Sequence, residues 1–437
     1  MLYGKAENEA MIHGSIIGYD LNEKNCQISY YSEEQHEPQT MEVAVDNYQI
    51  PLAITSKGDS WIYGKDAKRL AAVREGNVIS DLLNLAMDQE KVILRGKTYE
   101  GVWLLAKFIE LSLQQFRRID FITFTVPEMS VDIDKMLKGI GQRMGIPREA
   151  IYVQDYKESF CHYMFYQPKE LWQFESALFY CDRDEMKAYM LRKLKTRQSV
   201  GINTFVTVDE VASAQMNELA AVYPVLNVDK AKEADARFKM FIEGVFEKKL
   251  VSSVFLTGEG FENNWYPTSL KVLCNGRRAF LGNNLYSKGA CYTSYQKYLG
   301  LIEGPVYLDE TKMTEQISLR MRVDGKEQWY PIVSWGSRWY EADNQLEVLL
   351  EDTDDIEIHI ESLASGDLEV VTVEMDGIPK RKNYSVRIQI QVLFQNEKTC
   401  QIIFKDIGFG EFFPETDFQV EKTIHLGGSH GQFNSLS

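Results

Sequence analysis

The sequence lacks long apolar runs, paired cysteines and an apolar leader, and each absence speaks against a class of protein. No stretch approaches the roughly 18–20 uncharged apolar residues that a membrane-spanning helix needs. The first residues turn acidic without the apolar core of a secretory signal. Because no CxxC pair occurs, a disulfide framework and a cysteine metal site are both unfavoured. We expect a cytoplasmic protein in which most of the cysteines are buried as small apolar side chains; they are Cys26, Cys161, Cys181, Cys274, Cys291 and Cys400.

Positive charge is also scarce, since 48 Lys and Arg face 64 Asp and Glu, for a formal net charge of −16. Nucleic acids and anionic membrane surfaces are bound by clustered Lys and Arg, so we expect neither as a partner. Residues 341–374 hold twelve acidic side chains and no Lys or Arg. This run is either a calcium or polycation site or the solvent face of antiparallel strands, and its alternation with Leu, Val and Ile favours strands.

The first half of the chain has the pattern of a mixed α/β domain. Residues 15–20 and 26–31 are apolar or alternating runs around the polar turn Asn22–Asn25, which predicts a β-hairpin. We expect further strands over 41–45, 51–54 and 121–126, and helices over 66–74, 99–116 and 132–144.

The second half opens with the same pattern, which indicates an internal duplication of two α/β lobes. When the two hairpins are overlaid, Tyr19–Glu23 and Cys181–Glu185 match at two acids, and Asp20 coincides with Asp182. We predict strands over 177–181 and 187–191 with a turn between them, then a helix over 229–250 and a strand over 251–256.

The pattern changes from about residue 305, where helical periodicity stops. Strict alternation between turn signals predicts an antiparallel β-sandwich, with strands over 317–323, 356–360 and 386–392. Residues 427–437 are small and polar, and we expect them to be disordered.

A series of short motifs resembles DnaK-type heat-shock chaperones, within the superfamily of actin-like ATPase domains, along almost the whole chain. None is specific alone, and the order of all of them carries the resemblance. They are Ile17–Leu21, Gly64–Lys68, Phe121–Pro127, Tyr152–Asp155, Phe255–Gly260, Lys288–Ala290, Asp376–Pro379 and Ile403–Asp406.

The resemblance implies an α/β two-lobed actin-like ATPase fold with duplicated mixed sheets, followed by an all-β antiparallel sandwich that resembles a chaperone substrate-binding domain. Lobe I would be residues 1–176 and lobe II residues 177–304, with a reduced adenine-side subdomain. The sandwich would be residues 305–426, and residues 427–437 a disordered tail.

The resemblance also implies a site for ATP or ADP with Mg²⁺. The cofactor-binding candidates are Asp20, Asn22, Lys24, Gly258, Glu259 and Gly260. The catalytic candidates are Asp20, Asp155 and Asp182, of which Asp20 and Asp182 would also position the metal. Peptide binding would fall to Trp335 and Trp339.

Alternatives stay open at these positions. Asp20 has the alternative role of capping the hairpin turn. In the second hairpin, the place of the metal-positioning aspartate falls on Asp182 or else on Cys181 or Tyr180. Gly258 and Gly260 also suit a tight strand-to-helix turn, and the tryptophans also suit a core or interdomain role.

The phosphate-binding parts depart from the family pattern. Asn22-Glu23-Lys24 stands in place of Gly-Thr-Thr, and the second turn, Asp182–Glu185, has no glycine. Close approach of backbone N–H groups to phosphates needs small residues, and carboxylates repel phosphates. The lysine expected near Leu82-Leu83 is absent, and the segment between the second hairpin and Gly258 is short. We therefore expect weak or no ATP hydrolysis, and nucleotide binding itself is in doubt.

Three functions follow from these observations. The first is a chaperone-like protein-binding or regulatory protein on a degenerate nucleotide-binding scaffold, with a protein or peptide partner. The second is an active ATP-dependent chaperone in which Lys24, Arg183 and Asp20 form an unusual phosphate pocket. The third is an actin-like structural protein that polymerises, against which the terminal sandwich and the negative charge speak.

Overall fold

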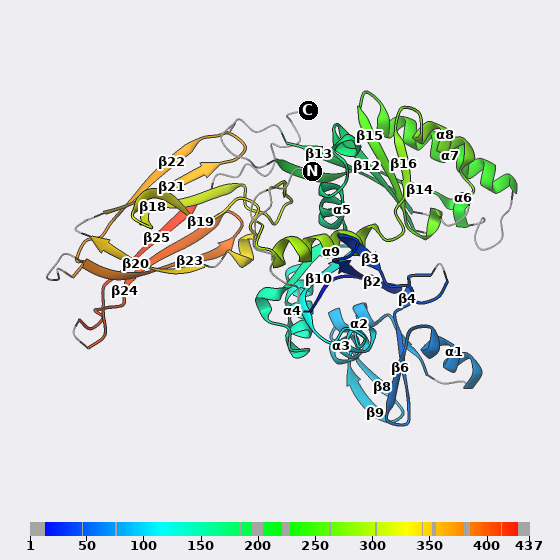
Figure 1. Ribbon diagram of the computed structural model, residues 1–437, viewed down its shortest axis with the longest axis horizontal. Helices are drawn as coiled ribbons and strands as arrows, with labels where there is room; N and C mark the ends of the chain where they lie inside the picture. The colour runs from blue at the N-terminus through cyan, green and yellow to red at the C-terminus, as the bar shows by residue number, and fades with distance from the viewer. Residues whose placement is uncertain are drawn as a thin grey trace. The chain divides into compact units, whose positions relative to one another are not determined.

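The computed structural model divides into two compact units (Figure 1). Unit 1 comprises residues 1–192 and 208–302, and unit 2 comprises residues 193–207 and 303–437. The described residues are 14–45, 47–74, 77–182, 185–194, 204–220, 228–261, 264–301, 304–342, 344–351, 355–379, 381, 385–411 and 413–426. The predicted disordered tail at 427–437 lies outside them.

The first sheet of unit 1 is mixed and has the order β11-β10-β1-β2-β3. Its centre is β1 (Ser15–Leu21), which is parallel to β10 (Ile119–Val126) and antiparallel to β2 (Asn25–Ser32). The outer strands are β11 (Ile151–Asp155), parallel to β10, and β3 (Glu37–Thr40), antiparallel to β2. The buried β1 and β10 are near-continuous apolar runs, as parallel pairing under helices requires.

The second sheet of unit 1 repeats this order as β16-β15-β12-β13-β14. Its bounds are β12 (Glu175–Asp182), β13 (Glu185–Lys193), β14 (Phe205–Gln215), β15 (Val251–Thr257) and β16 (Arg278–Leu281). Here β12 is parallel to β15 and antiparallel to β13, and β15 is parallel to β16. In both sheets a register shift follows the first residue of the central strand, at Ser15/Ile16 and at Glu175/Ser176. Shared order and shared irregularity support the duplication indicated by the sequence.

Two helices that follow the outer parallel strands join the sheets. They are α5 (Tyr156–Phe165), after β11, and α9 (Leu285–Tyr298), after β16, and they pack on one another. In Figure 1 both lie between the two sheets. The crossing is close because two glycines allow it: a Cβ at Gly289 would collide with the Ser159 carbonyl of α5. A Cβ at Gly18 of β1 would likewise collide with the Ser287 carbonyl of α9.

The remaining elements of unit 1 complete two apolar cores, one beside each sheet. With the first sheet pack β4 (Ile50–Pro51), β5 (Ala53–Lys57), β6 (Ser60–Tyr63), α1 (Gly64–Arg74), β7 (Ile79–Ser80), α2 (Leu82–Met87), β8 (Lys91–Leu94), β9 (Lys97–Glu100), α3 (Gly101–Ser112) and α4 (Val131–Arg143). With the second sheet pack α6 (Asn217–Ala220), α7 (Val228–Phe246) and α8 (Pro267–Leu273).

Three predicted elements need correction. The third strand lies at Glu37–Thr40, where it pairs with β2, and residues 41–45 form no strand. The helix expected over 99–116 is shorter, because Tyr99 and Glu100 pair with β8 as part of β9 and α3 ends at Ser112. The helix expected over 229–250 ends at Phe246, and Lys248 adopts a positive φ of 58° that no α-helix continues.

Unit 2 contains two four-stranded antiparallel sheets around one apolar core. One sheet has the order β19-β18-β21-β22 and the other β20-β23-β24-β25. Their bounds are β18 (Glu315–Val323), β19 (Lys326–Val333), β20 (Asn344–Glu351), β21 (Asp355–Ser362), β22 (Leu368–Glu374), β23 (Ser385–Asn396), β24 (Thr399–Asp406) and β25 (Gln419–His425). The predicted change from α/β to antiparallel β architecture is confirmed. Among the described residues, no helix has the length and apolar character to cross a membrane.

Candidate functional site

A cleft of about 390 Å³ lies in unit 1, where the two hairpins face each other. The hairpin β1-β2 and its turn supply Asp20, Asn22, Glu23, Lys24, Asn25 and Gln27, and the hairpin β12-β13 supplies Tyr180, Asp182, Glu185 and Lys187. Tyr156 at the start of α5, Tyr286 in α9 and the turn after β15 close the cleft. Six of the sequence-predicted site residues therefore meet around one space: Asp20, Asn22, Lys24, Asp182, Gly258 and Glu259.

Asp20 sits near the end of β1 with only 5% of its surface exposed. The Tyr156 hydroxyl donates a 2.7 Å hydrogen bond to its Oδ1 and accepts one from the side-chain amide of Asn22. Burial raises the pKa of Asp20 to about 7, against the hydrogen bond from Tyr156, which lowers it. The Tyr156 ring in turn stacks on Tyr286, with ring centroids 3.8 Å apart. The carboxyl group of Asp20 is thus held through Oδ1 by a tyrosine that is itself stacked on α9.

Lys24 is held by its own turn and by the opposite hairpin. The side chain of Asn22 accepts hydrogen bonds from the backbone N–H groups of Lys24 and Asn25, a local arrangement typical of asparagine turns. The Lys24 Nζ lies 2.8 Å from Oδ1 of Asp182 and 3.5 Å from Oε2 of Glu259. The single turn lysine that could meet a phosphate is therefore neutralised by two carboxylates.

The strand registers correct the overlay of the two hairpins. Asp20 is the fifth residue after the register shift of β1 and pairs with Thr125 of β10. The fifth residue after the register shift of β12 is Tyr180, which pairs with Thr257 of β15. Four residues lie between the paired Leu21 and Cys26 of the first hairpin. Four also lie between the paired Cys181 and Met186 of the second, so Asp182 corresponds to Asn22.

The register thus places Tyr180 at the position that corresponds to Asp20, and Tyr180 is one of the alternatives left open for the metal-positioning aspartate that the resemblance implies. Asp182 lies two residues further on and binds Lys24 instead. Arg183, invoked for an unusual phosphate pocket, lies outside the described residues.

The two glycines after β15 have a packing explanation. Gly258 adopts a φ of +99°, and a Cβ there would collide with the carbonyl oxygen of Cys181. A Cβ at Gly260 would collide with the Cys181 sulfur. The turn therefore needs glycine to pass the end of β12, whether or not a nucleotide binds. Glu259 between them turns toward Lys24.

Several predicted residues lie away from the cleft. Asp155 does not line it, and its carboxylate caps α5 by accepting a 2.8 Å hydrogen bond from the backbone N–H of Glu158. Leu82 and Leu83, where a catalytic lysine was sought, are buried core residues.

The two predicted peptide-binding tryptophans pack against apolar clusters of unit 2. Trp335 belongs to the cluster around Phe205 and Leu363 and donates a 3.3 Å hydrogen bond from its indole to a backbone carbonyl. Trp339 packs partly buried against the sandwich core. Both packings agree with the core role that was the open alternative.

The cleft lining is acidic and aromatic. Five carboxylates stand against two lysines, and each lysine has a carboxylate partner, Lys24 as above and Lys187 with Glu185 at 3.4 Å. Within the described ranges, no cluster of three His, Cys, Asp or Glu side chains could hold a metal ion. Sequence reasoning missed the tyrosines Tyr48, Tyr156 and Tyr286, because only the folded chain brings them together around the cleft.

Two family models match the chain. A family model described as the C-terminal part of a family of unknown function, DUF5716, matches residues 37–310. The chain belongs to the DUF5716 family. The DUF5716 match covers the second hairpin and the tyrosines of the cleft, while Asp20 and Lys24 precede it. A model of a domain of unknown function, DUF8552, matches residues 312–426, the sandwich. No curated protein matches the chain.

Proposed function

We propose that this DUF5716 protein is a chaperone-like protein-binding or regulatory protein on a degenerate actin-like scaffold, with weak or no ATP hydrolysis. The observation that carries the proposal is the Lys24–Asp182 ion pair across the cleft, at 2.8 Å. In a working phosphate site, a turn lysine and backbone N–H groups face the phosphates. Here the lysine faces two carboxylates of the protein itself.

The duplicated sheets support the scaffold part of the proposal. Two mixed sheets of the same order, joined by a pair of crossing helices, are the arrangement expected of the two-lobed actin-like fold. The resemblance to DnaK-type chaperones supports the protein-binding part, because the sandwich follows the lobes in the same order. We also propose a cytoplasmic location. It agrees with the state of the six cysteines, all of which are free.

Substitution at the metal-positioning places supports the loss of hydrolysis. Tyr180 stands where the duplicated fold would hold the partner of Asp20, and a phenol is a poor ligand for Mg²⁺, which prefers carboxylate and water oxygens. Asp20 keeps its carboxyl group but shares it with Tyr156.

Titration calorimetry of the full chain with ATP and Mg²⁺ tests the proposal. We expect no binding heat up to millimolar ATP and no phosphate release above the buffer rate. Micromolar binding with measurable turnover would overturn it.

The retained cleft favours one second candidate, an active ATPase with an unusual pocket around Asp20. Phosphate release by D20N beside the wild type separates the two functions. A wild-type rate that falls to background in D20N supports the ATPase, and equal background rates for both proteins exclude it.

A further inference from the structure

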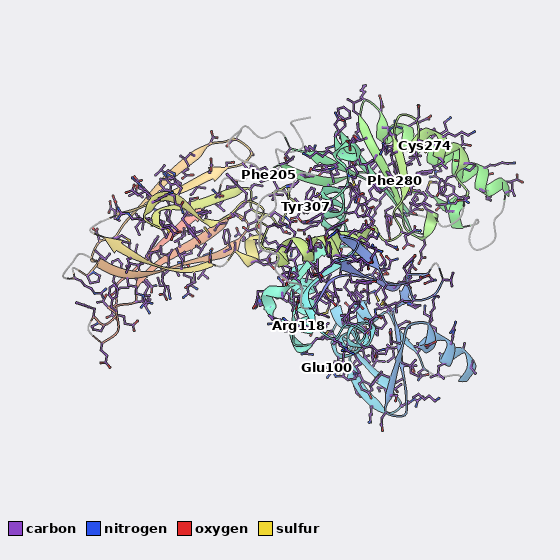
Figure 2. The ribbon with its side chains drawn as sticks, viewed as in Figure 1. Glu100, Arg118, Phe205, Cys274, Phe280 and Tyr307 are labelled. Carbon is purple, nitrogen blue, oxygen red and sulfur yellow. The ribbon has the colours of Figure 1, made fainter. Side chains whose placement is uncertain are left out.

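A second and larger hollow lies in unit 1, on the first sheet's side and away from the cleft. This groove measures about 1080 Å³ and runs between α3, the segment that follows α3, and the C-terminal half of α4. Its floor includes Leu113, Ile140 and Ile146, all at most 5% exposed, and the partly exposed Met144. Arg118, labelled in Figure 2, stands at one wall next to the start of β10. The apolar side chains that a partner can reach in this groove are those of the exposed Trp103 and the partly exposed Met144.

The groove carries an exposed aromatic anchor, Trp103 of α3, which is 39% exposed. Its ring is fixed from behind by Tyr99, at 5.1 Å between centroids, and by Trp61, at 5.3 Å. A tryptophan that is already ordered loses little conformational freedom on binding. Tryptophan and arginine are also the residues most enriched where binding energy concentrates in protein interfaces.

The charges of the groove are opposite in sign to those of the chain. Lys107 is paired with Glu110 and Arg118 with Asp120, at 3.1 and 2.7 Å. The remaining charged side chains of the groove, Arg117 and Arg143, are exposed and form no ion pair within the described part of the chain.

Two arginines therefore stay uncompensated on a protein of net charge −16. At physiological ionic strength charges beyond about 8 Å are largely screened, so the local arginines decide which partner docks.

The walls of the groove select a helix over an extended strand. The walls come from α3 and α4, and the one strand that contributes, β10, lies between β1 and β11 in the sheet. An incoming strand therefore finds no open sheet edge to pair with, whereas an amphipathic helix can lay its apolar face between two helices.

We propose that this groove binds an amphipathic helix of a partner protein, with apolar residues toward Leu113, Ile140 and Met144 and acidic residues toward Arg117 and Arg143. This inference names a class of partner for the protein-binding function proposed above, and it rests on that function. It concerns a surface separate from the cleft, so the ATP titration and the experiment below fail independently.

Selection from a displayed peptide library tests the proposal on the full chain. Each library peptide has 18 residues with a fixed leucine stripe at helical spacing, and its polar positions vary freely among Asp, Glu, Lys, Arg, Gln and Ser. We expect the enriched peptides to be acidic. Enrichment of basic peptides, or no charge preference, would overturn the proposal, as would the absence of any enriched binder.

Fluorescence anisotropy with the best peptide then locates the site. We expect micromolar binding that W103A weakens at least tenfold, and that the charge reversals R117E and R143E weaken at least tenfold as well. The arginines are exposed, so their variants keep the fold and the test does not depend on W103A alone. Matched controls are W329A, at an equally exposed tryptophan of unit 2, and R278E, on β16.

Several results contradict the proposal. Binding that W103A, R117E and R143E leave unchanged places the peptide elsewhere. Equal binding of a proline-interrupted version of the peptide excludes the helical mode. A wild-type chain that sediments as a dimer, with W103A monomeric, shows that a second copy and not a partner helix covers the groove.

Discussion

Lys24 and Asp182 lie 158 positions apart in the chain, and the Lys24 Nζ rests 2.8 Å from Oδ1 of Asp182. The two side chains come from the corresponding turns of the two duplicated hairpins. Both are about one third exposed, so solvent screens the pair and its contribution to stability is expected to stay below about 1 kcal/mol. Its main effect is on the cleft, since it removes the positive charge that a phosphate would need.

The first prediction concerns this neutralisation. The double variant D182N and E259Q frees Lys24 and removes two carboxylates that repel phosphate. The wild type is expected to give no binding heat up to millimolar ATP. We expect the double variant to give a binding heat in the same titration, with an affinity for ATP with Mg²⁺ at least tenfold above that limit, which corresponds to about 1.4 kcal/mol. Calorimetry under one set of salt conditions measures it.

The control for this prediction is E243Q with E247Q, which removes the same number of charges from the exposed surface near the end of α7. It should leave ATP affinity at the wild-type level. Equal gains in both double variants would mean that overall charge, and not the release of Lys24, governs the change.

The second prediction follows from the buried carboxyl group of Asp20. Burial raises its pKa to about 7 in the folded chain, while the unfolded value is near 3.9. Between about pH 4 and pH 7 the folded state therefore binds more protons than the unfolded state, and the contribution of Asp20 to stability falls as pH rises.

The variant D20N removes this dependence, because the amide stays neutral. We expect the free energy of unfolding of D20N minus that of wild type to increase from pH 5 to pH 8, by on the order of 2–4 kcal/mol. Urea unfolding at four pH values measures it. The companion variant Y156F removes the hydrogen bond that lowers the pKa of Asp20, so the pKa should rise further. A difference between D20N and wild type that is constant with pH would refute the assignment.

The third prediction concerns the helix crossing that shapes the cleft. A Cβ at Gly18 would collide with the backbone of α9 at Ser287 and Cys291, which a side-chain rotation cannot relieve. We expect G18A to cost about 1–3 kcal/mol of unfolding free energy. Gly139 in α4 is the matched control, because a Cβ there meets nothing within 4 Å. G139A should instead stabilise by about 0.5–1 kcal/mol through helix propensity. Equal effects of the two would show that α9 does not pack closely on β1.

The two hairpins show most clearly what can be predicted from the sequence and what cannot. Apolar alternation located β1, β2, β12 and β13 to within a few residues, because strand periodicity is a local property. The overlay of Asp20 with Asp182 failed, since an offset of two residues keeps every side chain on the same face and leaves the pattern unchanged. Only the register with β10 and β15 separates the two alignments.

The contacts that close the cleft were beyond sequence reasoning for a related reason. Tyr156 reaches Asp20 because Gly18 lets α9 pack closely on β1 and Gly289 lets α5 pack closely on α9. No sequence pattern around Tyr156 predicts its contact with Asp20. The strand over 41–45 was mispredicted because residues 41–45 alternate like a strand, although the partner strand β2 pairs with Glu37–Thr40.

The last prediction concerns Asp406, whose motif was assigned by resemblance alone. Its carboxylate is fully buried and accepts two hydrogen bonds from the Arg381 guanidinium, at 2.9 and 2.6 Å, and further ones from Gly408 and Thr416. Burial alone would raise the pKa of Asp406, and the hydrogen bonds from Arg381, Gly408 and Thr416 together lower it below its usual value.

Because the folded pKa of Asp406 is lowered, the stability that it contributes is present above about pH 4 and is lost as the pH falls further. Breaking a buried pair leaves Arg381 uncompensated, so D406N should destabilise unit 2 by about 3–5 kcal/mol at pH 7. Thermal unfolding of the full chain measures this loss, and the gap to wild type should narrow toward pH 3. The exposed pair of Arg320 with Glu327 in the same sandwich is the control, and E327Q should leave the midpoint unchanged. An unfolding midpoint of D406N equal to that of E327Q would mean that the contact between Asp406 and Arg381 does not stabilise the sandwich.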